Sequence, residues 1–208
     1  AQEVFTQQPP ALQEFLIASS TLKTLSPGLC EETLGLHGAE RFIAEIEDRN
    51  LFITRFEEGW YRYHHLFREY LQHRFREQDA ARWEAFHRRA AGWFLAQERF
   101  EEAVDHYLTV EAYDKAATVM QDAARTMFLN GHFKTLMRWG EHLPDSDLER
   151  VPRLALFQSR AADMLAQWNK ALTLAAQAEK GYNVTEDKNG IAYAQLHRCE
   201  IWQKQGKL

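Results

Sequence analysis

Apolar residues recur with a helical period along most of the chain, interrupted once by a short stretch with a different pattern. Near the start, Leu12, Phe15 and Leu16 are spaced for one face of a helix. A second short helix is predicted next, with Ser26 as its N-cap and Pro27 at its first position, because these residue types are favoured there. Three helices are therefore predicted before the interruption, the second at 28–34 and the third at 39–49.

The interruption is a predicted β-hairpin. β-branched and aromatic residues are dense at 51–56, and Glu57-Glu58-Gly59 follow as a turn signal. Residues 60–63 are predicted to pair back on the first strand. A helix comes next, whose apolar residues are Leu66, Phe67, Tyr70, Leu71 and Phe75. Three helices, a hairpin and a further helix in this order are the pattern of a winged helix.

Beyond about residue 80 the helical period continues to the end of the chain, with no convincing strand pattern. The connections between the helices are short, which predicts antiparallel neighbours. The predicted helices are 82–97, 100–110, 113–129, 133–143, 152–166, 169–181 and 190–205.

Three turns in this second region share one design, in which an aromatic residue stands three positions before a small or apolar one. The pairs are Phe100 with Ala103, Phe133 with Leu136, and Trp168 with Ala171. The last members of the pairs are 33 and 35 residues apart, close to the roughly 34-residue period of tetratricopeptide repeats. The alternative is an irregular helical bundle whose turns are similar by chance.

These patterns predict a mainly α-helical fold, with a winged-helix domain at 1–78 and a tetratricopeptide-like antiparallel helical repeat, an α-solenoid, at 79–208. Residues 1–8 resemble the tail of an earlier element, and 204–208 resemble the start of a further repeat. We therefore expect the chain to be a segment of a longer protein.

The composition argues against several classes of partner. A formal net charge of −5 is unsuited to coating DNA or an anionic membrane, because such binding relies on clustered Lys and Arg. The sequence has no long apolar run and no secretory signal, so we expect a cytoplasmic protein without membrane contact. Cys30 and Cys199 belong to no CxxC pair, and both are expected to be buried free thiols.

Motifs for catalysis are absent from the sequence. There is no phosphate loop, no GxGxxG, no HExxH and no GxSxG, so we expect no enzymatic activity and no catalytic residue. We also expect no metal site, because no two histidines stand four residues apart on one helix. DNA binding by the third predicted helix is disfavoured by its charges, which are Glu40, Glu45, Glu47 and Asp48 against Arg41 and Arg49.

The most informative stretch is 60–71, which reads Trp-Tyr-Arg-Tyr-His-His-Leu-Phe-Arg-Glu-Tyr-Leu. It resembles the winged-helix signature of STAND-class ATPases, especially the MalT-like large ATP-binding regulators of the LuxR type. Residues 8–16, 50–52 and 87–91 resemble the same family. The resemblance extends over about residues 3–120, and beyond them it rests on repeat character alone.

The resemblance implies a role for the histidine pair that opens the last winged-helix helix. In this class an aromatic or Met, a His and a polar residue stand there, and Tyr63, His64 and His65 match them. The family's histidine contacts the bound nucleotide diphosphate in the resting form, which assigns that contact to His64. Many relatives carry Asp where this chain has His65, so it is open which histidine faces nucleotide. The alternative is that His64 is a helix-capping or half-buried residue without a ligand.

The function implied by the resemblance is that of a signal-responsive, ATP-dependent transcription regulator. Its winged helix would relay the state of ATP or ADP bound in a preceding nucleotide-binding domain, and no cofactor is expected within these 208 residues. The helical repeats would begin the sensor for an inducer or a regulatory protein, and DNA would be bound only by a later C-terminal domain. The alternative is a protein-interaction adaptor built of helical repeats, without a nucleotide switch.

Overall fold

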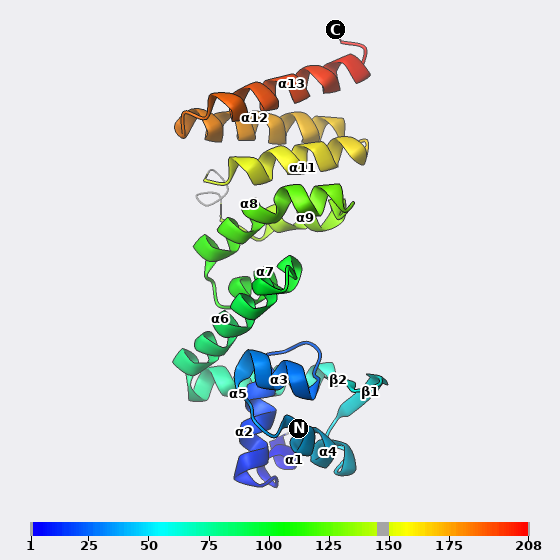
Figure 1. The fold of residues 1–208 in the computed structure, drawn as a ribbon, viewed down its shortest axis with the longest axis vertical. Coiled ribbons are helices and arrows are strands. Elements are labelled where there is room, and N and C mark those ends of the chain that lie inside the picture. Colours follow the sequence, from blue (N-terminus) through cyan, green and yellow to red (C-terminus); the bar gives the residue numbers. More distant parts are fainter. Residues whose placement is uncertain (1, 145–149, 208) are drawn as a thin grey trace. The chain divides into compact units, whose positions relative to one another are not determined.

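The computed structural model describes residues 2–144 and 150–207 (Figure 1). The predicted fold class is confirmed, since a winged helix with one small hairpin is followed by helical repeats. The chain divides into two units, 1–98 and 99–208. The predicted domain boundary at 78 falls between α5 and α6, and the first unit continues through α6.

The first unit contains the elements of the predicted winged helix and two further helices. The elements are α1 (Gln2–Thr6), α2 (Pro10–Ser19), α3 (Pro27–Leu34), α4 (Ala39–Asp48), β1 (Ile53–Glu57), β2 (Trp60–Tyr63), α5 (His65–Gln78) and α6 (Ala80–Ala96).

Local signals explain the bounds of α3. The Ser26 side chain accepts a hydrogen bond from the Leu29 N–H at 3.2 Å, and Pro27 occupies the first turn. At the other end Gly35 has φ 67°, and its N–H donates to the Glu31 carbonyl at 3.0 Å. A left-handed residue at this position ends the helix, and glycine adopts that conformation without steric cost.

The hairpin is antiparallel, with Ile53 opposite Tyr63 and an irregular register near the turn. The first strand begins at Ile53 rather than Leu51, because Asn50 and Phe52 adopt left-handed φ values of 51° and 52°. A backbone bridge also joins β2 to the segment before α3, where the Leu25 N–H donates to the Tyr61 carbonyl at 2.7 Å. The wing is thereby fixed to the helical part of its unit.

The helix α1 belongs to this unit, so the prediction that residues 1–8 are the tail of an earlier element is wrong for the part described. Phe5 is 1% exposed. Its ring lies edge-on to Tyr70 with centroids 5.9 Å apart, and the Arg74 guanidinium lies 4.9 Å from the ring centroid. Both partners are on α5, which a sequence pattern 65 residues away does not reveal.

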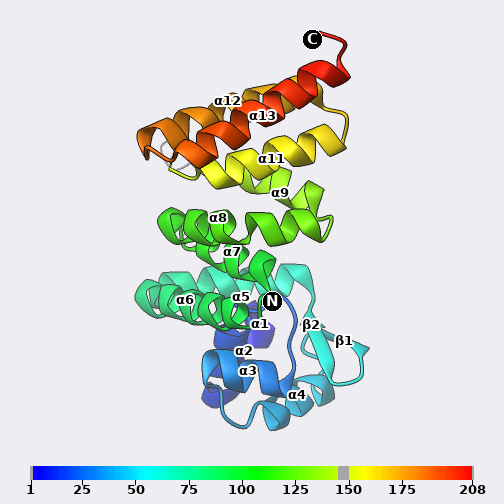
Figure 2. The ribbon, with the colours of Figure 1, turned by 45° about the horizontal axis from the view of Figure 1, so that its top comes forward.

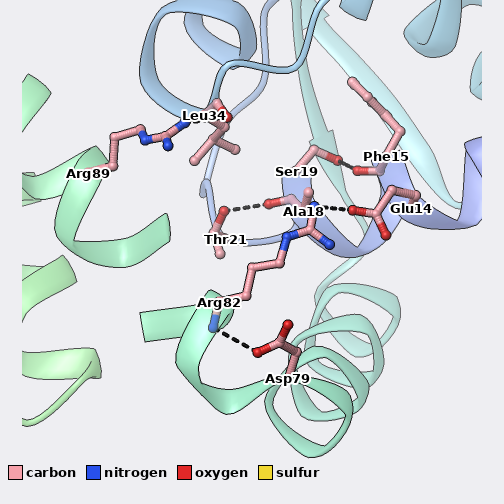
Figure 3. Close-up of polar contacts among 9 residues, drawn as sticks. All are labelled: Glu14, Phe15, Ala18, Ser19, Thr21, Leu34, Asp79, Arg82 and Arg89. Atoms are coloured by element: carbon pink, nitrogen blue, oxygen red, sulfur yellow. Dashed lines mark hydrogen bonds and ion pairs between the residues drawn. The ribbon is translucent and has the colours of Figure 1, made fainter. Parts of the chain in front are cut away.

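The helix α6 is attached to the winged helix by polar contacts as well as apolar ones (Figure 3). Asp79 caps it by accepting from the Arg82 N–H at 2.9 Å, and the Arg82 side chain pairs with Glu14 of α2. The Arg89 side chain donates to the Leu34 carbonyl at the end of α3, at 2.9 Å. These contacts explain why α6 is part of the first unit.

The second unit is a series of helices, and short turns join those whose connections are described throughout (Figure 2). Each helix contacts the next one along the chain where both are described, and α11 also contacts α8 and α9. The described helices are α7 (Phe100–Thr109), α8 (Tyr113–Leu129), α9 (Phe133–Glu141), α11 (Pro152–Met164), α12 (Trp168–Val184) and α13 (Lys188–Lys204).

The turns of the second unit repeat one geometry. A residue in the left-handed region stands two positions before the helix start, as at Gly131 with φ 78° before α9 and Ala166 with φ 57° before α12. The small or apolar members of the predicted pairs, Leu136 and Ala171, are fully buried. Recurrent turn geometry favours helical repeats over an irregular bundle. The expected further repeat at 204–208 includes Leu208, which lies outside the described residues.

Candidate functional site

His64 and His65 lie at the junction between β2 and α5. The His64 N–H donates to the Phe52 carbonyl at 2.7 Å, which ties the junction to the start of β1. The His64 carbonyl accepts from the N–H groups of Phe67 and Arg68, each at 3.0 Å, so His64 is the N-cap residue of α5. Its side chain makes no capping hydrogen bond. The imidazole therefore has no structural role in starting the helix.

Both imidazoles are exposed and lie beside each other. Their ring centroids are 4.5 Å apart, with 32° between the ring planes. The N–H groups of His65 and Leu66 are in the first turn of α5, where a helix offers no carbonyl to accept from them. Imidazole donors next to such N–H groups, at the positive end of the helix dipole, suit the binding of an anion.

The packing beneath the two histidines holds the junction in place. Tyr63 is buried, and its hydroxyl is 2.8 Å from the Ser19 hydroxyl on α2. Burial raises the pKa of the Tyr63 phenol well above its ordinary value. Phe67 is buried against Tyr63, with centroids 6.0 Å apart, and against Phe52 at 5.1 Å. Leu66, which the sequence pattern placed with these apolar residues, is 61% exposed.

Two residues of α5 that sequence reasoning missed connect the site to the turn after α2. The Arg68 Nε donates to the Ser20 carbonyl at 3.0 Å and to the Leu22 carbonyl at 3.1 Å. Gln72 donates to the Ser20 carbonyl at 2.9 Å. Burial lowers the pKa of Arg68, which marks it as a largely desolvated cation. Nothing in the local pattern distinguishes these side chains from the solvated polar residues around them.

The first unit matches a known domain. Residues 1–83 match the family model described as the MalT winged helix domain. They form a MalT winged helix domain. The match covers α1 to α5 and the start of α6, including the histidine junction.

Relatives resemble the chain beyond the MalT winged helix domain. The HTH-type transcriptional regulator MalT of Klebsiella pneumoniae (strain 342) is 29% identical over 187 residues, which are 89% of this chain and 21% of the regulator. The serine/threonine-protein kinase PknK of Mycobacterium tuberculosis (strain ATCC 25618 / H37Rv) is 28% identical over 158 residues, which are 75% of this chain and 14% of the kinase. The chain thus spans about a fifth or less of the length of these relatives.

Within the MalT winged helix domain, α4 has an acidic surface. The Glu45 carboxylate is 2.8 Å from the Arg49 guanidinium, and Arg41 lies over the Phe42 ring at 4.9 Å. Arg41 and the C-cap residue Arg49 therefore both have intramolecular contacts, and the exposed carboxylates of α4 repel phosphate. That this helix does not bind DNA stays a prediction.

The cysteines and histidines show no sign of a shared site in the described part of the chain. No group of three or more His, Cys, Asp or Glu side chains is placed to hold a metal ion among residues 2–144 and 150–207. Cys30 is buried as expected, whereas Cys199 is exposed, so the expectation of two buried thiols is wrong for Cys199. It lies on a face of α13 that no described helix covers.

None of the described helices is both long and apolar enough to cross a membrane.

Proposed function

We propose that this chain is the winged helix and the first helical repeats of a signal-responsive, ATP-dependent transcription regulator. The observation that carries the proposal is the pair of exposed imidazoles, His64 and His65, at the start of α5 in a MalT winged helix domain. The His64 side chain does not cap the helix. Exposed donors of this kind are suited to binding a ligand or a domain outside this chain.

In this proposal the nucleotide is held by a nucleotide-binding domain N-terminal to the winged helix. Bound ADP supplies the phosphate oxygens, and His64 donates a hydrogen bond to them, with His65 as the alternative donor. Charge-assisted hydrogen bonds of this kind are stronger than neutral ones. The residues present fit this task, because both imidazoles and the first N–H groups of α5 lie at one helix end.

The winged helix would relay the nucleotide state through α5. Arg68 and Gln72 join α5 to the turn after α2, so a shift of α5 at His64 would also move the Ser20 carbonyl. The helical repeats would receive an inducer or a regulatory protein, and DNA would be bound by a separate C-terminal domain of a cytoplasmic regulator. Inducer binding would then be coupled to the nucleotide state by a shift from an ADP-bound resting population to an ATP-bound active one.

The experiment uses the full-length protein with His64→Ala and, separately, His65→Ala. We expect the variant of the contacting histidine to lower ADP affinity about tenfold, the usual loss for one hydrogen bond to a charged group. Basal transcription should rise in the same variant. His73→Ala is the matched control, because His73 is an exposed histidine further along α5 that pairs with Glu77 at 3.2 Å. Unchanged ADP retention in both test variants refutes the contact.

A second candidate is a protein-interaction adaptor without a nucleotide switch. It is favoured by one observation, which is that a relative named as a kinase aligns with 75% of the chain. A module that occurs in proteins with such different names could serve as a scaffold in each. The two candidates are separated by the parent protein's sequence, because only the regulator requires a phosphate loop upstream of residue 1.

A further inference from the structure

A cavity of about 770 Å³ lies within the repeat unit, between α8, α11 and α13. The last turn of α12 and the turn that follows it complete the wall. In Figure 2 the helices α11, α12 and α13 lie side by side, in agreement with their contacts. The volume is within the range of small-molecule sites, roughly 300–1,000 Å³.

Arginine side chains dominate the charge of the cavity lining. Arg125 comes from α8, Arg150 from the turn before α11, Arg153 from the first turn of α11, and Arg160 from two helical turns further along α11. Arg160 lies over the rings of Phe128 and Phe157, 5.4 Å and 6.0 Å from their centroids. In the described part of the chain, the other three guanidinium groups have neither an ion pair nor a hydrogen bond.

Among the described residues, the carboxylates in the lining form no ion pair with these arginines. Asp187 accepts from the Gly190 N–H at 2.9 Å and thereby caps α13. Glu200 is 3.3 Å from the Nδ1 of His197. Asp122 is the remaining acid of the lining. The lining thus contains four arginines and three carboxylates, and this excess of positive charge attracts anions.

Aromatic residues also line the cavity, and a glycine makes room for one of them. A Cβ at Gly190 would come within 2.3 Å of the Tyr182 ring, so only glycine lets this ring pack against the start of α13. Tyr182 is 7% exposed, whereas Tyr193 at the rim is 64% exposed. His197 also lines the cavity, and its buried Nε2 has no hydrogen-bond partner among the described residues.

We propose that this cavity binds a small organic anion, with a carboxylate or phosphate group on an aromatic or aliphatic body. The anion is held by the guanidinium groups of Arg125 and Arg153, which offer several donors in a planar arrangement that suits both acidic groups. The body of the ligand lies against Tyr182, Tyr193 and Phe157. That the anion acts as an inducer rests on the proposed function, whereas its binding in the cavity does not.

The binding test uses the 208-residue chain and isothermal titration calorimetry. The probes are phenyl phosphate and phenylacetate, with benzyl alcohol as the neutral analogue. We expect one of the anions to bind at a single site and the alcohol to bind at least about tenfold more weakly. Salt at about 0.5 M should lower the affinity for the anion. The stronger anion identifies the acidic group.

Two variants locate the site, and a third is the control. Arg125→Gln and Arg153→Gln should each lower the affinity for the anion about tenfold, because each variant loses one charge-assisted contact. Arg138→Gln is the control, since Arg138 is an arginine of the same unit that pairs with Glu101 outside the cavity. Equal affinity in all variants, or no binding of either anion at millimolar concentration, overturns the proposal. Binding of an acidic peptide without binding of either small anion also overturns it.

The role as inducer is tested separately in the full-length regulator. Arg153→Gln should remove the response of transcription to the anion and leave ADP retention unchanged. His64→Ala should alter ADP retention and leave the affinity of the cavity unchanged. If ADP retention does not respond to His64 while the anion still binds, the proposed nucleotide relay fails and the cavity stands. If ADP retention responds but the anion does not bind, the cavity proposal fails and the relay stands.

Discussion

The winged-helix unit and the repeat unit are both helical, but among the described residues charged side chains that donate to distant carbonyls occur in the first, and fully buried alanines are more numerous in the second. In the winged-helix unit, charged side chains reach carbonyls far away in the sequence, as Arg68 does to Ser20 and Leu22 and Arg89 does to Leu34. In the repeat unit, small residues lie at the helix interfaces. The fully buried alanines there are Ala103, Ala116, Ala124, Ala161, Ala162, Ala171, Ala175, Ala178 and Ala194.

This difference has a physical consequence for how each unit responds to substitution. A buried carbonyl that loses its donor keeps the full desolvation cost, so the winged-helix unit depends on a few polar side chains. A helix interface built on small residues depends on close approach, and added volume has no space to occupy. We expect polar truncations to damage the first unit and added methyl groups to damage the second.

The largest effect should follow from Arg68→Met, which keeps the apolar stem and removes both hydrogen bonds. The Leu22 carbonyl then has no side-chain donor, while Gln72 still donates to Ser20. We expect the free energy of unfolding to fall by about 3 kcal/mol. Denaturant unfolding measures this change as a lower midpoint.

The control for this prediction is Arg62→Met. Arg62 is exposed on β2 and lies over the Phe56 ring at 5.7 Å. We expect it to change the free energy of unfolding by no more than about 0.5 kcal/mol. Similar losses in the two variants would show that the Arg68 hydrogen bonds do not hold α5 to α2.

The second largest effect is expected in the repeat unit. Gly190→Ala should lower the free energy of unfolding by about 2 kcal/mol. The new methyl group would lie 2.3–2.5 Å from atoms of the Tyr182 ring, so the ring or the start of α13 has to move. Gly92→Ala is the matched control in the winged-helix unit, because Gly92 is an exposed residue of α6 with no atom within 4 Å of an added Cβ.

Gly92→Ala should raise the free energy of unfolding by about 0.5–1 kcal/mol, through helix propensity alone. Thermal and denaturant unfolding of the two variants should therefore give changes of opposite sign. A Gly190→Ala variant that is as stable as the parent would mean that Tyr182 does not pack directly on α13.

The smallest effect concerns pH and the buried Cys30. Burial, as the main cause, raises the pKa of its thiol from 9.0 to about 12. In the unfolded chain the thiol ionises near its ordinary value, so this contribution to stability is complete below pH 9 and is lost as the pH rises toward 12. At about pH 10 the loss should be about 1 kcal/mol, and Cys30→Ala should remove this part of the pH dependence.

Thiol labelling provides an independent measure of the same burial. Cys199 is exposed and should react with a disulfide reagent in the folded chain, whereas Cys30 should react only when its unit opens. An unchanged pH dependence in Cys30→Ala, together with rapid labelling of both cysteines, would contradict the buried environment of Cys30.

Several structural features could be predicted from the sequence because they depend on neighbours along the chain. The helix predicted at 113–129 is α8, Tyr113–Leu129, and the helix predicted at 28–34 begins one residue earlier, at Pro27. Caps, prolines and apolar spacing act within a few residues, so their signals are present in the local pattern. The hairpin turn at Gly59, with φ 72°, likewise depends on a local signal, because glycine readily adopts this conformation.

The candidate site could be predicted only in part. The sequence, through its resemblance to a family, identified His64 and His65, and the structure places both at the surface with their rings adjacent. A nucleotide contact by either stays a prediction. The sequence did not identify Arg68 or Gln72, because hydrogen bonds to carbonyls of a turn distant in the sequence have no counterpart in the spacing of α5 itself.

By itself the sequence determined the order of helices, the position of the hairpin and the repeated turns, since these follow from backbone preferences and local burial. The tertiary structure alone decided that α1 packs on α5, that Leu66 and Cys199 are exposed, and that the arginines of α8 and α11 line one cavity. Such placements depend on which faces of distant helices meet. A helical period shows only that an element has an apolar face, and the partner for that face is selected by packing in three dimensions.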